Sequence, residues 1–338
     1  MKAAVISFTE NGDELNKRLG PALKGFETEH CGKSFGGRSV SLAEWTRGKF
    51  DSCSLIIFIG AAGIAVRACA PYVRAKDKDP AVIVIDERGR YVIPLLSGHI
   101  GGANRLSRHL AKYLGADAVI TTATDINGVW SVDEWAAENG YRIYDTGTIK
   151  YISAALLRGE PVGLVSSFEI KGDLPLGITA SENTECGIYI SDIPDAPFKY
   201  TLCLMPKRLI IGAGSKAGAD RCALSELYEK IKTENAISAV PASVATIDIK
   251  ANEPSVKSLA QHTGAELCTF TAEELNSVKG CFTASEFVRS VTGTDNVCER
   301  AAVICGERQG RKTDIIVKKT VGNGVTAALA VMDWSVVF

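Results

Sequence analysis

The chain has 338 residues, of which 46% are hydrophobic and 23% are charged, a composition that excludes long disordered segments and a membrane-embedded chain. This length predicts about two domains and allows three small ones. The 38 lysines and arginines balance the 39 aspartates and glutamates, so the chain lacks the overall positive charge that would hold nucleic acid or an anionic membrane. An anionic ligand must therefore be met by a local cluster of positive charge.

The ten cysteines indicate reduced thiols in the cytoplasm, because the chain is long and its first residues contain no signal peptide. No two cysteines lie two to four residues apart, and the four histidines form no paired signature of a metal site. We therefore expect a cytoplasmic protein without a metal site of its own.

The first 128 residues alternate short apolar runs with helical patterns. The predicted strands are residues 2–8, 54–59, 81–86, 91–96 and 118–125. A turn at 87–89 joins two of these strands into a hairpin, and a helix follows at 97–115, where Gly115 is a typical stop signal. This alternation predicts an α/β domain with a mostly parallel sheet over residues 1–128.

The rest of the chain divides into two further segments. Residues 129–206 contain more turn residues and short strands such as PVGLVS and GIYIS, which predicts a small α+β middle domain. A new alternation begins with the strand RLIIG, continues through the helix RCALSELYEKIK and the strand SVATIDI, and ends in two strands, TDIIVKKTV and VTAALAVMD. We predict a separate, mostly parallel α/β domain over residues 207–338.

Glycine-containing loops follow apolar strands at 60–63, 97–104 and 212–218. At such junctions the backbone can approach a ligand and direct helix N–H groups at a carboxylate or phosphate, although α/β proteins also contain many bare turns of this kind. The third loop is similar to a dinucleotide fingerprint, with Asp248 as a possible ribose acceptor. Its spacing is not GxGxxG, so an NAD(P)-binding oxidoreductase is the alternative with the poorer fit.

Positive charge is concentrated around the first two of these loops. The basic residues there are Arg67, Arg74, Lys76, Lys78, Arg105 and Arg108. In open α/β sheets the ligand lies outside the carboxyl ends of the strands, where we expect these loops to converge on a substrate with several carboxylates. His99 lies between small, polar residues, and its titration range suits general acid or base catalysis.

The same region resembles the CbiG family of anaerobic cobalamin biosynthesis. The elements GIAVR, K-x-x-DPAV, DE-x-G, LLSGHxGGAN and TTATD occur here in order. The C-terminal part, with IGAGSK, ATIDIKANEP, NVCERAA and VKKTVGNGVTAALA, is similar to the family's C-terminal domain, which CobE-type proteins share. The resemblance covers nearly the whole chain and favours three domains.

This resemblance implies a cobalt-precorrin-5A hydrolase, which opens the δ-lactone of a ring-contracted corrinoid and releases acetaldehyde to give cobalt-precorrin-5B. It implies no cofactor, because the substrate carries the cobalt, and neighbouring enzymes of the pathway are possible partners. A non-catalytic carrier of the same corrinoid is the alternative from another class. The family commonly has a cysteine and a basic run after the C-terminal glycine turn, where this chain has Ser215-Lys216-Ala217, which argues against a required cysteine nucleophile.

On this basis we predict three catalytic residues. His99 is the general acid or base, Asp125 is its orienting partner or an alternative base, and Ser97 supplies a hydrogen-bond donor. Glu299 is as readily a structural carboxylate at a helix start as a functional one. The predicted substrate-binding residues are Gly63, Arg67, Lys76, Gly101, Gly102, Asn104, Arg105, Thr122, Lys250, Glu253 and Glu299.

Overall fold

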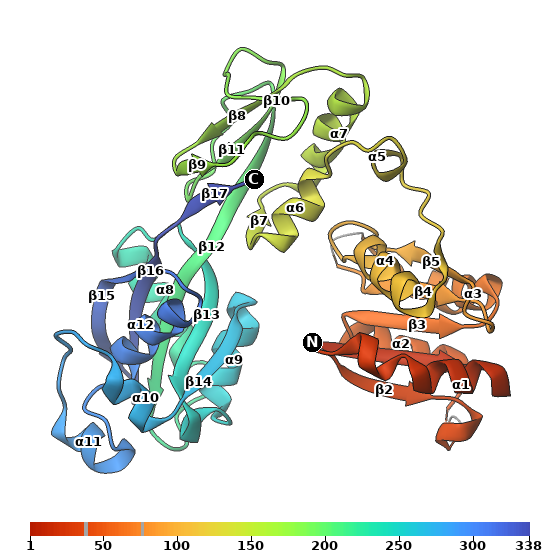
Figure 1. Ribbon diagram of the computed structural model, residues 1–338. Coiled ribbons are helices and arrows are strands. Elements are labelled where there is room, and N and C mark those ends of the chain that lie inside the picture. The colour runs from red at the N-terminus through yellow and green to blue at the C-terminus, as the bar shows by residue number, and fades with distance from the viewer. Residues whose placement is uncertain (37–39, 76–77) are drawn as a thin grey trace. The chain divides into compact units, whose positions relative to one another are not determined.

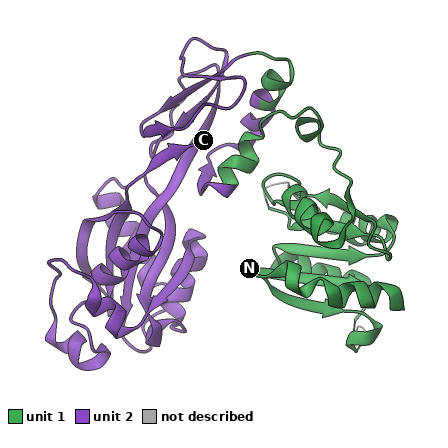
Figure 2. Ribbon diagram, viewed as in Figure 1, with its two compact units in different colours: residues 1–137, 153–160 green, residues 138–152, 161–338 purple. Residues whose placement is uncertain are grey.

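The computed structural model describes residues 1–36, 40–75 and 78–338. The chain divides into two compact units, unit 1 with residues 1–137 and 153–160 and unit 2 with residues 138–152 and 161–338 (Figure 2). Each unit contains one large, mostly parallel sheet with helices packed on it (Figure 1). The predicted α/β class is therefore confirmed.

The sheet of unit 1 has six strands in the order β2-β1-β3-β4-β5-β6. In chain order these strands are β1 (Lys2–Ser7), β2 (Glu27–Cys31), β3 (Leu55–Ile59), β4 (Ala81–Ile85), β5 (Tyr91–Leu96) and β6 (Asp117–Ala118). Neighbouring strands are parallel except for β4 and β5, which form the predicted hairpin. Because the hairpin reverses the chain, the carboxyl end of β5 lies beside the amino end of β4, where Leu96 pairs with Val82.

Helices cover both faces of this sheet, which is why β3 and β4 are continuous apolar runs. One face carries α1 (Glu10–Arg18) and α4 (Ala103–Leu114), and the other carries α2 (Leu42–Ser52) and α3 (Ala62–Cys69). Short 3₁₀ turns lie at Gly20–Leu23, Lys33–Phe35 and Ala70–Tyr72. Ser41 and Glu44 form a capping box at the start of α2, and Gly115 ends α4 in the left-handed conformation, as predicted.

The strand predicted at 118–125 is wrong. Only Asp117 and Ala118 pair with β5, and the β-branched residues that follow leave the sheet edge after Val119 donates a hydrogen bond to the Val92 carbonyl. The chain then forms a short helix, α5 (Ala123–Ile126). β-branched residues favour extended backbone, but the pattern does not separate an edge strand from an extended loop.

Two further helices lie in the region where the sequence indicated turns and short strands. These are α6 (Val132–Glu138) and α7 (Ile149–Leu157), with a 3₁₀ turn at Thr146–Thr148 between them. The start of α6 carries the pattern Ser131-x-x-Glu134, which is a sequence signature of a helix N-terminus. This signal was available in the sequence.

The sheet of unit 2 has nine strands and is built around one long strand, β12. Its main path is β10-β8-β11-β12-β13-β14, in which every pairing is parallel, while β7 and β16 pair with β12 in the antiparallel sense. In chain order the strands are β7 (Tyr141–Ile143), β8 (Val162–Ser166), β10 (Ile178–Thr179), β11 (Cys186–Ile190), β12 (Tyr200–Ser215), β13 (Val240–Ile247), β14 (Glu266–Phe270), β15 (Thr313–Gly322) and β16 (Val325–Met332). A separate parallel pair joins β9 (Glu169–Lys171) to β17 (Ser335–Val337).

Helices also pack on both faces of this second sheet. α8 (Ala223–Glu234) and α9 (Pro254–Thr263) lie on one face and α12 (Cys298–Arg308) lies on the other. Two short helices, α10 (Ala272–Ser277) and α11 (Glu286–Thr292), precede α12, and a 3₁₀ turn lies at Asp248–Lys250. Leu209, Ile211 and Ala213 of β12 face α8 and α9, whereas the alternate position Gly212 faces α12. Because successive side chains of a strand point to opposite faces of the sheet, β12 contributes to the packing against helices on both faces.

The boundary predicted at residue 206 falls inside β12, which continues from the middle segment into the C-terminal segment without a break. The C-terminus also returns to the middle segment, where β17 pairs with β9 and the Trp334 indole donates to the Tyr141 hydroxyl (3.0 Å). Residues 138–152 and 161–206 of the middle segment therefore share one compact unit with the C-terminal segment, whereas residues 129–137 and 153–160 belong to unit 1. The division into three domains stays a prediction.

The cysteines and the possibility of membrane-spanning segments were also subjects of the sequence-based expectations. All ten cysteines are free thiols, and most of them are buried. Within residues 1–36, 40–75 and 78–338, no helix combines the length and the apolar character that crossing a bilayer requires.

We expect Gly212→Ala to destabilise unit 2 by about 3 kcal/mol or more. A Cβ at this position would overlap the Cys298 carbonyl oxygen, and neither backbone can move away without opening the contact between sheet and helix. The matched control is Gly48→Ala in α2, where a Cβ meets nothing within 4 Å, so that this change gains up to about 1 kcal/mol of helix propensity. Thermal unfolding of both variants checks the prediction, and an unchanged melting curve for Gly212→Ala would contradict it.

Candidate active site

The turn between β5 and α4 holds His99 in a strained backbone. Ser97 has a φ of 56°, in the left-handed region that non-glycine residues rarely adopt, and Gly102 has a φ of 76°. A Cβ at Gly101 would overlap Ser97, so only glycine fits there. The Ser97 hydroxyl donates to the Asp79 carbonyl (2.9 Å) and fixes the turn to the start of β4. Strain that the surrounding packing maintains is typical of functional sites.

Three backbone N–H groups at the end of this turn and the start of α4 donate to carbonyls of the turn itself. Gly102 donates to the His99 carbonyl (2.8 Å), and Ala103 and Asn104 donate to the carbonyls of Ser97 and Gly98. Of the two predicted backbone donors, the Gly102 N–H is therefore occupied, whereas none of these hydrogen bonds uses the Gly101 N–H. Ser97 and Gly102 already have partners, so the geometry favours positioning functions for both.

His99 lies between two aspartates. Its Nε2 is 3.0 Å from Oδ2 of Asp125, and its Nδ1 is 3.3 Å from Oδ2 of Asp133. The second oxygen of Asp133, Oδ1, is 3.2 Å from Nδ1 but is buried without a directed hydrogen bond. The side chains of Asp125 and Asp133 are only 7% and 5% exposed, against 15% for His99, so a ligand reaches the imidazole more easily than either carboxylate.

This arrangement keeps His99 protonated at neutral pH. The hydrogen bond with Asp133 contributes most, burial opposes it, and Asp125 adds to it, so that the pKa of His99 is raised to about 9. Burial disfavours the charged form of Asp125, but hydrogen bonds from His99 and Arg108 outweigh burial and lower the pKa of Asp125. The site therefore holds an imidazolium, which can donate a proton.

The carboxylate of Asp125 has three hydrogen-bond partners. Besides His99, it accepts hydrogen bonds from the Asn104 amide (2.8 Å) and the Arg108 guanidinium. The same Asn104 amide also donates to the Thr122 hydroxyl (3.1 Å). The structure thus brings together His99, Asn104, Thr122 and Asp125, four of the residues that the sequence singled out. Since its oxygens are engaged, Asp125 is better placed to orient His99 than to act as a separate base.

Asp133 is the residue of this cluster that sequence reasoning missed. It lies in the first turn of α6, a helix that was not predicted. The Ser131-x-x-Glu134 signature would have indicated that helix, but nothing in the sequence shows that its first turn meets a loop more than 30 residues earlier in the chain.

The same cluster offers candidate ligands for a cation. His99, Asp125 and Glu134 bring three donor atoms within 4.8 Å of one another. However, Arg108 contacts Asp125 and lies 4.0 Å from Glu134. Its guanidinium, together with the imidazolium, already balances much of the negative charge that would attract a metal ion.

The predicted convergence of all the loops is wrong for Gly63 and Arg67. These residues follow the carboxyl end of β3, and the Arg67 guanidinium lies against Gly63. His99 follows β5, which runs in the opposite direction, so the two loops lie at opposite edges of the sheet. Arg105 is exposed on α4 beside Gly102, and Lys76 lies outside the described residues.

The three predicted residues of the C-terminal segment belong to unit 2. Lys250 and Glu253 form an ion pair (3.0 Å) with both side chains largely buried. Glu299 is fully buried, and its oxygens accept hydrogen bonds from the N–H and hydroxyl of Thr283 and from the Lys319 N–H. This geometry favours the structural alternative for Glu299, because it ties the loop at Thr283 and the strand β15 to α12.

The glycines of the C-terminal turn are also explained by packing. A Cβ at Gly212 would overlap α12, and one at Gly214 would overlap the Thr326 hydroxyl on β16. α8 begins only at Ala223, well after the turn, whereas a dinucleotide fingerprint leads directly into its helix. The structure therefore gives no support to the dinucleotide alternative.

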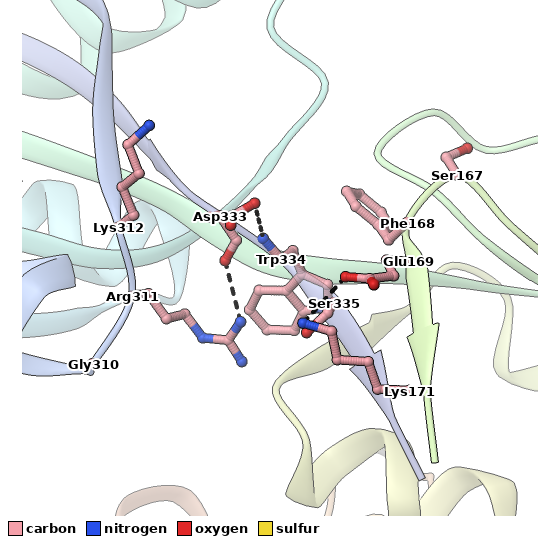
Figure 3. Close-up of a pocket in the computed structure, with 10 residues that line it drawn as sticks. All are labelled: Ser167, Phe168, Glu169, Lys171, Gly310, Arg311, Lys312, Asp333, Trp334 and Ser335. Carbon is pink, nitrogen blue, oxygen red and sulfur yellow. Dashed lines mark hydrogen bonds and ion pairs between the residues drawn. The ribbon is translucent and has the colours of Figure 1, made fainter. Parts of the chain in front are cut away.

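Two cavities among the described residues of unit 2 have similar volumes but different linings, one polar and one apolar. The polar pocket, of about 480 Å³, lies between the strands β9 and β17 and the start of β15 (Figure 3). Its charges have partners close by, since Lys171 pairs with Glu169 and Arg311 donates to the Asp333 carbonyl and stacks on Trp334. The second, which we call the apolar pocket, has about 460 Å³ and lies at the carboxyl ends of β12 and β13, beside α11 and the β15–β16 hairpin.

The chain is similar to known proteins along nearly its whole length. Three family models match, described as cobalamin synthesis G N-terminal at residues 44–125, cobalamin biosynthesis central region at 130–206 and cobalamin synthesis G C-terminus at 209–330. A cobalt-precorrin-5A hydrolase from Salmonella typhimurium is 34% identical over 324 residues, which are 90% of this chain and 92% of that protein. A protein of the same name from Priestia megaterium is 29% identical over 363 residues, covering 98% and 95% of the two chains.

Among solved structures, CobE, a protein from the cobalamin biosynthetic pathway, is 26% identical and covers 38% of this chain and 92% of its own, with a TM-score of 0.35. The family models and the two relatives together extend along nearly the whole sequence. The order of the three matched regions is also the order in which the family's motifs were found. This chain belongs to the CbiG family of cobalamin biosynthesis proteins.

Proposed function

We propose that this chain is a cobalt-precorrin-5A hydrolase, which opens the δ-lactone of its substrate and releases acetaldehyde. The observation that carries this proposal is the match to two relatives of that name over 90% and 98% of this chain. The His99 cluster supports it, because a partly exposed imidazolium held by two carboxylates suits a reaction in which an oxygen must gain and lose a proton.

The reaction has two steps. Water adds to the acyl carbon of the lactone and the carbon–oxygen bond breaks, so that a carboxylate and an alkoxide form and the alkoxide takes a proton. The resulting alcohol then loses that proton as its carbon–oxygen bond becomes the carbonyl of acetaldehyde. The adjacent carbon–carbon bond breaks in the same step, and its electron pair stays on the macrocycle, which is protonated. The cobalt is part of the substrate throughout.

His99 is suited to serve the oxygen that the two steps share. As an imidazolium it donates a proton to the leaving alkoxide, and the neutral imidazole can take a proton from the alcohol in the second step. Asp125 and Asp133 orient the imidazole ring and stabilise its positive charge. Ser97 fixes the turn through its hydrogen bond to Asp79, and Asn104 donates a hydrogen bond to Asp125. Of the proposed anchors for substrate carboxylates, Arg105 lies on the same helix as Asn104, whereas Arg67 lies at the opposite edge of the sheet.

A single-turnover assay with cobalt-precorrin-5A under anaerobic conditions tests the proposed function. We expect stoichiometric acetaldehyde, detected by coupling to alcohol dehydrogenase, together with the absorption change of the corrinoid. A non-catalytic carrier would bind the substrate and change its spectrum without releasing acetaldehyde. That outcome would contradict the proposal.

A further inference from the structure

The apolar pocket of unit 2 has the volume of a small-molecule site. Its cavity of about 460 Å³ lies within the range of roughly 300–1,000 Å³ that ligand pockets occupy. It opens where the parallel strands β12 and β13 end, and the carboxyl ends of parallel strands are where α/β folds place their ligands. The proposed mechanism does not use any residue of this pocket.

Its walls leave an unusual amount of apolar surface in contact with water. Val297 and Val325 form part of the buried lining, while Phe287, Val291 and Val321 at its margin are 77%, 59% and 70% exposed. A patch of large apolar side chains that are exposed around a cavity is typical of a surface that binds a ligand or a partner. The ligand should therefore present a broad apolar face.

The charged residues that line the pocket are all lysines, namely Lys216, Lys250 and Lys319. Lys250 is paired with Glu253. Among the residues that the structure describes, no carboxylate lies within ion-pair distance of Lys216 or Lys319. The Lys216 side chain extends across Gly324, where a Cβ would overlap it, so the glycine allows the ammonium to lie against the hairpin. An apolar floor with unpaired lysines fits a flat apolar ring that carries carboxylate arms.

We propose that the apolar pocket of unit 2 binds the corrin macrocycle of the substrate, with Lys216 and Lys319 pairing with its acetate or propionate side chains. This inference rests on the proposed function, which identifies the ligand as a corrinoid. The lining of the pocket indicates where that ligand binds. It also gives a function to the turn in which this chain departs from the family pattern. Lys216 follows Ser215 there, and the Ser215 hydroxyl donates to the Lys216 carbonyl (2.9 Å) and contacts Ser255 (3.1 Å).

Titration of the full chain with cobyrinic acid, a stable cobalt corrinoid with free carboxylates, tests the pocket by absorption and fluorescence without any turnover. We expect the double variant Lys216→Gln, Lys319→Gln to raise the Kd at least about tenfold, since two charge-assisted contacts are lost. The matched control is Lys318→Gln, which makes the same change at the neighbouring exposed position of β15, outside the pocket lining. Phe287→Ala, at a position too exposed to affect folding, should raise the Kd about fivefold.

The ligand provides a second control. The fully methyl-esterified corrinoid keeps the ring but lacks the charges, so it should bind the parent chain and the double lysine variant alike. Wild-type affinity in the double variant, or no binding of cobyrinic acid by the parent chain, would overturn the inference even if acetaldehyde is released. Lysine-dependent binding without acetaldehyde release would instead overturn the proposed function and leave the corrinoid pocket standing.

Discussion

Replacing His99 with glutamine is expected to lower acetaldehyde release in a single turnover by about 10²–10⁴-fold, the range that a positioned acid or base contributes. Glutamine can donate and accept hydrogen bonds, but it has no proton to give at neutral pH. Substrate affinity, measured by the absorption change before turnover, should stay close to that of the parent chain, because the lost interaction concerns the leaving oxygen.

The control for this variant is His109→Gln, the same substitution at an exposed position of α4 whose imidazole contacts only the Ala22 carbonyl among the partners given by the structure. We expect full activity from it. Removing His99 also leaves Asp125 and Asp133 without the cation between them, so the variant should lose about 2–3 kcal/mol of stability in urea unfolding. Activity must therefore be measured where both variants are folded. Near-normal turnover by folded His99→Gln would exclude His99 as the proton donor.

The same ion cluster sets a pH dependence of stability. The pKa of His99 rises from about 6.5 in the unfolded chain to about 9 in the folded one, so the folded state binds the proton more tightly. Its contribution is full below pH 6.5 and is lost as the pH rises through 9. The lowered pKa of Asp125 acts at the other end, since its contribution is present above the unfolded value and is lost as the pH falls through the folded value.

Four of the six strands of unit 1, namely β1, β3, β4 and β5, could be predicted from the sequence because they are local patterns. β2 was missed, and most of the strand predicted at 118–125 does not form. Continuous apolar runs gave β3 and β4, and the turn at 87–89 gave the hairpin. The hairpin also determines where His99 lies, because the reversal of β5 places His99 at the edge of the sheet opposite Arg67. The direction of each strand therefore decides which loops of this sheet meet.

Other parts of the site depend on contacts between distant segments, which no local pattern records. Asp133 reaches His99 only because α6 folds back onto the turn at 97–102. In the same way, β12 runs across the predicted boundary at residue 206 because both its halves find partners in one sheet. No sequence pattern singles out the exposed Phe287 and Val291, and only the cavity beside them indicates a function for them.

Replacing Asp133 with asparagine is expected to move the alkaline limb of the pH dependence of kcat/KM from near 9 towards 6.5. The hydrogen bond with Asp133 is the largest contribution that raises the pKa of His99, and a neutral amide of the same shape removes most of it. At pH 6 the variant still carries a protonated His99 and should keep activity within about tenfold of the parent chain. At pH 8.5 its His99 has lost the proton, so activity should fall much further.

This pH profile separates a positioning function from a merely structural one. A variant that is only less well folded would lose activity by the same factor at every pH. The alkaline limb of its kcat/KM profile would stay at the same pH. Asp117→Asn, the same substitution at an exposed position of β6 beside the start of β5, removes an acidic charge from unit 1 away from His99 and should leave the profile unchanged. If the alkaline limb of the kcat/KM profile of Asp133→Asn stays near pH 9, then Asp133 does not raise the pKa of His99. The contacts of His99 with the two aspartates would then not be equivalent in function.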